Sequence, residues 1–171
     1  MTDTVSVRAP QGPKNGHAIR VTSTTFPADG MIPAKVAFGG CGGQNVSPQL
    51  AWANAPEGTK SFALICFDPD APTGSGFYHW VVANIPASVT SISENTVPPG
   101  AVQGSTDYGE SKYGGPCPPT GDPPHRYHFT VYALDIPSIE SAGPTMTGAR
   151  LVFSMRGHLL AQGTLTGKYA R

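Results

Sequence analysis

Short apolar segments separated by clusters of glycine and proline most constrain what this chain can fold into. Of its 171 residues, 21 are glycine and 18 are proline. Glycine favours turns and proline removes a backbone donor, so long helices have little room to form. Segments rich in β-branched and aromatic residues recur between the turns, at 19–25, 34–38, 61–67, 79–85 and 126–134. This punctuation predicts a mainly β domain.

The segment at 61–67 is apolar on both of its alternating faces. That pattern is typical of a central strand covered on both sides, and it predicts two packed layers. Residues 86–125 are rich in turn formers, and we expect at least one short strand near 100–105 within them.

One segment near the C-terminal end has a helical pattern instead. Apolar residues recur there at steps of three or four residues, after the candidate N-caps Thr145 and Thr147. This periodicity predicts one C-terminal helix near 147–161, ended near Gly163. The fold class predicted from the sequence is therefore mainly β with a single helix.

Length and charge limit the domain number and the partners. A chain of this length is expected to form one domain. Residues 1–16 hold glycine and proline among polar residues and predict a flexible N-terminal arm before a domain at 17–171. The 11 Lys and Arg cancel the 11 Asp and Glu, so the basic field that nucleic-acid binding requires is missing. We expect no nucleic-acid partner.

The cysteines and the hydropathy predict a cytoplasmic protein. Cys41, Cys66 and Cys117 are an odd number without CxxC spacing, which indicates reduced thiols and no disulfide. The start of the sequence has no apolar run typical of a secretory signal, and no stretch approaches the roughly 18 apolar residues of a membrane span. We therefore expect no stable membrane insertion.

The string Asp68-Pro69-Asp70-Ala71-Pro72 directly follows the central apolar strand. Proline pushes the residue before it to extended geometry, so the carboxylates stand in a stiff loop at a strand end. Such loops are well suited to building sites. The alternative is a plain Asp-Pro turn whose carboxylates bond nearby backbone N–H groups.

Two histidines stand at strand starts, where the rim of a pocket would lie. His79 opens the segment at 79–85 and His125 precedes the segment at 126–134. Strand alternation places His125 and Tyr127 on one face, with Arg126 and His128 on the other. The remaining histidines, His17 and His158, together with His128, are interpreted as structural or surface residues.

The loop Gly114-Gly115-Pro116-Cys117-Pro118-Pro119 has few N–H groups, which could form an anion-binding concavity. With the imidazoles and the tyrosine hydroxyl, it favours a pocket for a phosphate-like anion. Two alternatives use the same atoms. A metal could be held by Asp68, His79, Cys117 and His125, although their spacing matches no known motif. Cys117 could also act as a nucleophile with His125 as its base.

Five ordered strings give the chain a specific resemblance. They are Asn45–Trp52, Asp68–Pro72, His79–Pro86, Gly114–Pro119 and His125–Tyr127. In this order they resemble the phosphatidylethanolamine-binding protein family, also called Raf kinase inhibitor proteins, and most of all its bacterial and archaeal branch. The resemblance covers about residues 18 to 171.

The resemblance implies a large, mainly antiparallel sheet packed against a smaller one, and an anion pocket at the surface. The pocket positions carried over from the family are Asp68, His79, Gly115, Pro116, Cys117, Pro118, His125 and Tyr127. Asp70 would brace the loop, and the Ala71–Pro72 peptide bond would be cis. Animal members have glycine at the position of Cys117 and a longer C-terminal helical segment, so access to the pocket is expected to differ.

These observations predict a non-catalytic protein that binds a phosphate-bearing or other small anionic group and so modulates a partner. Neither a metal nor another cofactor is expected. Inhibition of a kinase does not follow from the sequence. The alternative is a small hydrolase that uses His125 or His79 with Asp68 or Cys117. A third hypothesis is a protein that acts through a protein partner or as a homodimer.

Overall fold

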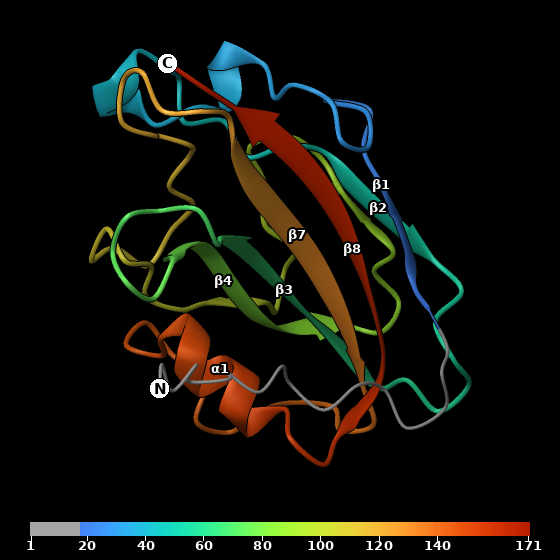
Figure 1. Cartoon of the computed structure of the whole chain (residues 1–171). Coiled ribbons are helices and arrows are strands. Elements are labelled where there is room, and N and C mark those ends of the chain that lie inside the picture. The colour runs from blue at the N-terminus through green and yellow to red at the C-terminus, as the bar shows by residue number, and fades with distance from the viewer. Residues whose placement is uncertain (1–17) are drawn as a thin grey trace, which may run out of the picture.

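The computed structural model describes residues 18–171, in which two antiparallel sheets pack together (Figure 1). The predicted N-terminal arm at 1–16 and His17 lie outside the described residues. The large sheet has the strand order β6-β4-β3-β7-β8, and the small sheet has the order β1-β2-β5. Their bounds are β1 Arg20–Thr22, β2 Leu50–Ala53, β3 Ser61–Asp68, β4 Phe77–Pro86, β5 Ser91–Ile92, β6 Val102–Gln103, β7 His125–Leu134 and β8 Leu159–Tyr169.

Strand β3 is buried on both faces, as its apolar pattern predicts. Phe62 and Leu64 join a core between the two sheets that also holds Trp52 of the small sheet. Ala63 and Ile65 face the opposite side, where the second core lies. The predicted central strand in a two-layered β fold is therefore confirmed.

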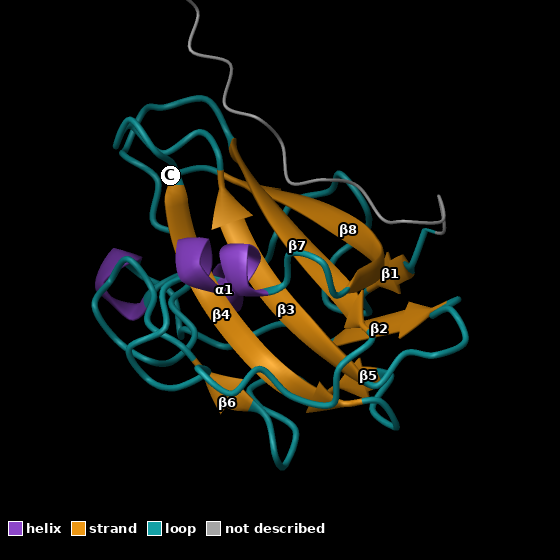
Figure 2. Cartoon of the chain, turned by 90° about the horizontal axis from the view of Figure 1, so that it is seen from below, coloured by secondary structure: helices purple, strands orange, loops and turns teal. Residues whose placement is uncertain are grey.

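The second core is closed by the helix α1 (Gly148–Ser154), which covers the outer face of the large sheet (Figure 2). The Thr147 side chain caps this helix by accepting a hydrogen bond from the Arg150 N–H at 3.2 Å. The prediction of a helix near the C-terminal end is confirmed, but its second half is wrong. Gly157 has φ +87°, a left-handed conformation that turns the chain away from the helix, and Leu159 already pairs with β7.

Two other expectations are wrong in detail. The expected strand at 34–38 contains the 3-10 helix η1 (Ala34–Val36), because the Val36 and Ala37 N–H groups donate to the local carbonyls of Pro33 and Ala34. A second 3-10 helix, η2, follows at Gly39–Cys41. No described peptide bond is cis, so the Ala71–Pro72 bond is trans. The short strand expected near 100–105 is confirmed as β6.

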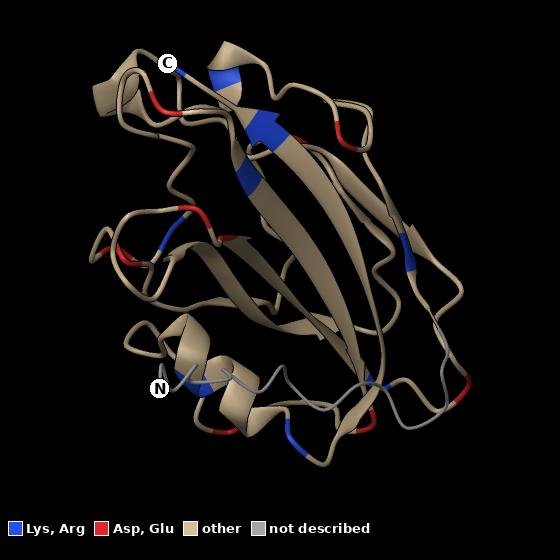
Figure 3. Cartoon of the chain, in the orientation of Figure 1, with Lys and Arg blue, Asp and Glu red and all other residues tan. Residues whose placement is uncertain are grey.

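The antiparallel order brings three strand termini to one end of the molecule. The end of β3 lies beside the starts of β4 and β7, since Asp68 pairs with Phe77 and Phe67 pairs with both Tyr78 and His128. Figure 1 shows η1, η2 and the end of β8 at this same end. Charged residues are sparse along the strands, with Arg126 at the start of β7 beside Lys168 near the end of β8 (Figure 3).

Candidate functional site

A cavity of about 200 Å³ opens where these strand termini meet. Six of the eight predicted pocket residues line it: Asp68, His79, Cys117, Pro118, His125 and Tyr127. Gly115 and Pro116 do not line it. The rest of the wall is formed by Ala71, Pro72, Thr73, Phe77, Tyr108 and Pro119. The topology thus gathers side chains that are up to 59 positions apart in the sequence, from Asp68 to Tyr127.

Asp68 and His125 form a buried pair in the wall of the cavity. The His125 Nδ1–H donates to Asp68 Oδ2 at 2.8 Å, and the side chains are only 5% and 3% exposed. The other Asp68 oxygen accepts from the Asp70 N–H at 2.8 Å. His125 Nε2 lies 3.1 Å from Asp122 Oδ2. Each polar atom of Asp68 and His125 is therefore already bonded within the protein.

The electrostatics of this pair favour a charged imidazole. Burial lowers the pKa of His125, but the hydrogen bonds and charges of Asp68 and Asp122 outweigh that effect and raise the pKa above its ordinary value. Because both ring nitrogens face carboxylate oxygens, both must carry a proton for the two hydrogen bonds to form. The two carboxylates therefore favour the imidazolium form of His125.

Asp70 lies beside the cavity and ties the Asp-Pro loop to β7. Its oxygens accept from Arg126 Nη2 at 2.8 Å, from Nε at 3.0 Å and from the Arg126 backbone N–H at 2.9 Å. These hydrogen bonds lower the pKa of Asp70 to about 2. Asp70 lines a neighbouring hollow together with Asp122, Pro123, Pro124, His125, Arg126 and Lys168. Its contacts are those of a residue that braces the loop.

His79 is also buried in the cavity wall but has a different electrostatic state. Its Nδ1 lies 2.8 Å from the Gly114 carbonyl oxygen, so this nitrogen carries the proton. Burial lowers the pKa of His79, and the Gly114 carbonyl and the Asp68 charge offset that only in part. A neutral ring with a proton on Nδ1 leaves a lone pair on Nε2, which can accept a hydrogen bond.

Tyr127 is fully buried, and its hydroxyl has no hydrogen-bond partner among the described residues. Burial raises the pKa of Tyr127, and the neighbouring Asp68 carboxylate raises it further through its charge and its closeness to the hydroxyl, so the hydroxyl stays protonated and can donate. The Tyr127 and His79 rings meet edge to face, with centroids 5.2 Å apart. His125 and Tyr127 share one face of β7 while Arg126 is exposed, as strand alternation predicts.

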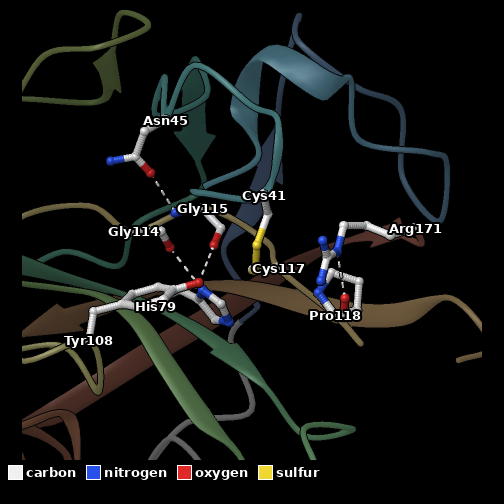
Figure 4. Close-up of a disulfide and its surroundings, with 9 residues drawn as sticks. All are labelled: Cys41, Asn45, His79, Tyr108, Gly114, Gly115, Cys117, Pro118 and Arg171. Carbon is white, nitrogen blue, oxygen red and sulfur yellow. Dashed lines mark hydrogen bonds between the residues drawn. A yellow bond between two sulfur atoms is a disulfide. The ribbon is translucent and has the colours of Figure 1, made fainter. Parts of the chain in front are cut away.

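The loop at 114–118 is held in two ways (Figure 4). Its first part is held by hydrogen bonds: the Gly115 N–H donates to Asn45 Oδ1 at 2.7 Å, and the Tyr108 hydroxyl donates to the Gly115 carbonyl at 2.8 Å. A Cβ on Gly115 would lie 2.1 Å from the Val36 carbonyl oxygen, so glycine allows this close approach. Its second part is tied by a disulfide between Cys117 and Cys41.

This disulfide corrects two interpretations of the sequence. Cys41 and Cys117 are not reduced thiols, because the fold brings residues 76 positions apart to a Cα–Cα distance of 5.7 Å. Only Cys66 is a free cysteine among the described residues. A sulfur in a disulfide is neither a free nucleophile nor a metal ligand, so the roles considered for Cys117 in hydrolysis and in metal binding are both wrong. Disulfides are typical of oxidising compartments, so the thiols no longer support a cytoplasmic location.

Several residues of the site were missed by sequence reasoning. No sequence motif includes Phe77, Tyr108 or Asp122. Asn45 belongs to one of the five strings that carry the resemblance, but its role in the site was not predicted. Within residues 18–171, no group of three or more His, Cys, Asp or Glu side chains is placed to hold a metal ion. No helix in the described part is long and apolar enough to cross a membrane.

Comparisons with known proteins identify the family and the fold. The family model described as "Phosphatidylethanolamine-binding protein" matches residues 22–170. The chain is 42% identical over 161 residues to YbcL of Escherichia coli (strain K12), covering 89% of this chain and 87% of YbcL. A Methanothermobacter thermautotrophicus protein is 42% identical over 151 residues, covering 85% and 95% of the two chains.

Two solved structures are similar over nearly the whole chain. The crystal structure of E. coli YbcL, described as a new member of the mammalian PEBP family, has a TM-score of 0.86 at 41% identity, with 90% of this chain and 98% of that one covered. A homologue from Chlamydia trachomatis, CT736, has a TM-score of 0.80 at 36% identity, with 91% and 99% covered.

Proposed function

Because the chain belongs to the phosphatidylethanolamine-binding protein family, we propose that it binds a phosphate-bearing or other small anionic group in the cavity between His79 and His125, and thereby modulates a partner. The modulating part of this proposal rests on the family alone. The proposal that the ligand is an anion rests on the polar atoms of the cavity. An anion needs hydrogen-bond donors that are not already bonded to other groups of the protein.

The observation that carries the proposal is the buried Tyr127 hydroxyl without a partner. A buried donor left unpaired costs about 1–3 kcal/mol, so such groups call for an explanation. A bound anion would give this hydroxyl an acceptor oxygen. A second donor is the Cys117 N–H. It is the only backbone N–H in the loop at 116–119, because the other three residues are prolines.

The affinity of this site for an anion should depend on the protonation state of His79. While His79 is neutral, its Nε2 accepts a hydrogen bond, which suits the hydroxyl of a singly protonated phosphate group. Below its lowered pKa, the ring donates from both nitrogens and adds a positive charge. Affinity for an anion is therefore expected to rise with acidification, at a pH below the ordinary range of histidine near 6.5.

The test is a thermal-shift titration with inorganic phosphate, phosphoserine and acetate, compared between wild type and Tyr127→Phe. A ligand that binds only the folded protein raises its melting temperature. We expect a phosphate-dependent shift in wild type and an affinity about tenfold weaker in Tyr127→Phe, the usual size for a hydrogen bond to a charged group.

The matched control is Tyr132→Phe, which makes the same change on the same strand. Tyr132 lies in the second core, on the face of β7 that is away from the cavity. It should bind phosphate as wild type does. A wild-type protein that shows no shift with any of the three anions, or a Tyr127→Phe protein with full affinity, would contradict the proposal.

The oligomeric state and the location remain predictions of the same proposal. A homodimer follows from the family resemblance, and light scattering of the purified chain checks it. The cytoplasmic prediction is checked by fractionation of cells that express the full chain, with the redox state of Cys41 and Cys117 as a second readout.

A further inference from the structure

The charged residues in the cavity wall and just beside it carry no net positive charge. The His125 imidazolium lies between the carboxylates of Asp68 and Asp122. On the outer side, Arg126 and Asp70 form a bidentate ion pair. A doubly charged anion that entered the cavity would therefore find no net positive charge in these residues. Lys168 lines only the neighbouring hollow, so a cation that contacts an anion in the cavity itself has to come from another residue.

Arg171 is placed to be that cation. Its Nε–H donates to the Pro118 carbonyl oxygen at 2.8 Å, and Pro118 lines the cavity. Figure 4 shows the guanidinium beside Pro118 and close to the Cys41–Cys117 disulfide. At the other end of this residue, an oxygen of the Arg171 carboxylate accepts from the Gly121 N–H at 3.2 Å, so this negative charge is hydrogen-bonded to Gly121. Arg171 is thus anchored to the rim of the cavity by two hydrogen bonds.

The charge of Arg171 reaches the cavity wall. Burial raises the pKa of Tyr108, which lines the cavity, and the Arg171 guanidinium works against that rise. Among the described residues, no carboxylate forms an ion pair with Arg171. Because its anchor uses only Nε, both Nη groups remain for an acceptor, in the planar fork that suits phosphate oxygens.

We propose that Arg171 supplies the charged contact at the mouth of the cavity and makes the site prefer doubly charged over singly charged anions. This inference rests on the proposed anion binding and names the residue that sets its charge preference. A dianion gains more from one added positive charge than a monoanion does, because Coulomb energy scales with the product of the charges.

The test measures binding of inorganic phosphate and of acetate at pH 8 and constant ionic strength, in wild type, Arg171→Gln and Arg171→Lys. At pH 8 phosphate is mainly doubly charged and His79 is neutral. His79 then adds no positive charge, so the effect of the Arg171 charge is measured separately. We expect Arg171→Gln to weaken phosphate binding about fivefold and acetate binding less, with Arg171→Lys in between.

Two further measurements separate a charge effect from a structural one. The phosphate affinity of wild type should fall with added KCl, and that of Arg171→Gln should fall less steeply. The matched control Arg20→Gln removes one exposed arginine from β1 and should bind phosphate within about twofold of wild type.

Wild-type phosphate affinity in Arg171→Gln, or equal losses for phosphate and acetate, would overturn the inference and leave the proposed function standing. A wild-type protein that binds neither anion would refute the proposed function and the inference together. Melting temperatures of all variants without ligand identify any loss that comes from unfolding.

Discussion

The cavity is lined by two groups of residues in opposite states: a paired side, formed by Asp68 and His125, and an unpaired side, formed by His79 and Tyr127. On the paired side, Asp68 and His125 bond to each other and to neighbouring groups, so no polar atom of either is left over. On the unpaired side, the Tyr127 hydroxyl has no hydrogen-bond partner among the described residues, and a neutral His79 ring offers Nε2 as an acceptor. The difference indicates that the paired side builds the site and that the unpaired side is where a ligand would be contacted.

The two histidines show what produces this difference. His125 lies between two carboxylates, which raise its pKa in spite of burial, whereas His79 bonds to a neutral carbonyl, so burial dominates and lowers its pKa. Two things separate the histidines: His79 lies deeper in the protein, so burial lowers its pKa more, and only His125 has carboxylates as hydrogen-bond partners. A histidine at the rim of a site therefore says little about its role until its partners are known.

The largest expected effect comes from removing the disulfide that holds the loop at 114–118. Cys41→Ser opens the disulfide without altering a cavity residue, and it should lower the free energy of unfolding by about 4 kcal/mol, because the bond spans 76 positions. The first part of the loop keeps its bonds to Asn45 and Tyr108, so the contact between the Gly114 carbonyl and His79 should survive.

Urea unfolding of oxidised wild type and of Cys41→Ser measures this loss, with dithiothreitol-treated wild type as a second route to the same state. In Cys41→Ser, phosphate affinity should also fall, because Cys117 and Pro118 line the cavity. Equal stability of the oxidised and reduced proteins would contradict the prediction.

The next largest effect should come from Asp68→Ala, which breaks the paired side. Removing one partner of a buried ion pair leaves the other charge uncompensated, a loss of about 3 kcal/mol. The control Asp135→Ala breaks an aspartate–histidine pair with His158 that is 37% and 44% exposed, so it should change stability by less than about 1 kcal/mol. Denaturant unfolding at pH 6 compares the free energies of unfolding of Asp68→Ala and Asp135→Ala. Similar losses would contradict the prediction that the buried pair contributes more to stability than the exposed pair.

Much of the site could be predicted from the sequence because strand alternation and loop chemistry are local properties. They placed His125 and Tyr127 on one face and Asp68 in a stiff loop at the end of β3. The disulfide and the Arg171 contact could not be predicted, since both join segments that only the tertiary fold brings together. No local pattern marks such a pair.

The strand β8 was missed for a related reason. Gly163 and Gly167 weaken a strand pattern, because glycine has no side chain to pack. In the fold they are required: a Cβ on Gly163 would lie 1.7 Å from the Ile19 carbonyl oxygen, and one on Gly167 would lie 2.6 Å from the Ile32 side chain. The segments that these glycines accommodate are distant in sequence, so their purpose is visible only in three dimensions.

A smaller effect separates the two histidines by pH. The raised pKa of His125 contributes stability that is complete below about pH 6.5 and is lost as the pH rises through its folded pKa. The lowered pKa of His79 does the reverse: its contribution is complete above about pH 6.5 and is lost as the pH falls toward its folded pKa. Stability should therefore decline on both sides of a maximum in this range.

The groups that face each ring decide which variant removes which decline. Asp68, Asp122 and Asp70 act on His125, and the charges of Asp68 and Asp107 act on His79. Unfolding free energies are measured from pH 5 to pH 8. In His125→Gln, stability should no longer decrease toward alkaline pH. In His79→Gln, the decrease toward acid pH should become smaller. His128, whose pKa burial also lowers, accounts for the remaining acid decline. An unchanged profile in His125→Gln would contradict the assignment.

The smallest expected change in stability tests the unpaired side directly. Tyr127→Phe removes a hydroxyl that has no partner, so the unfolding free energy should stay the same or rise, by less than about 1 kcal/mol. The matched control is Tyr113→Phe, since the buried Tyr113 hydroxyl donates to the Val36 carbonyl at 3.0 Å and its loss leaves that acceptor unpaired. Tyr113→Phe should therefore lose about 1–2 kcal/mol. If Tyr127→Phe lost as much as Tyr113→Phe without ligand, the Tyr127 hydroxyl would have a partner in the free protein, and the distinction between the two sides of the cavity would fail.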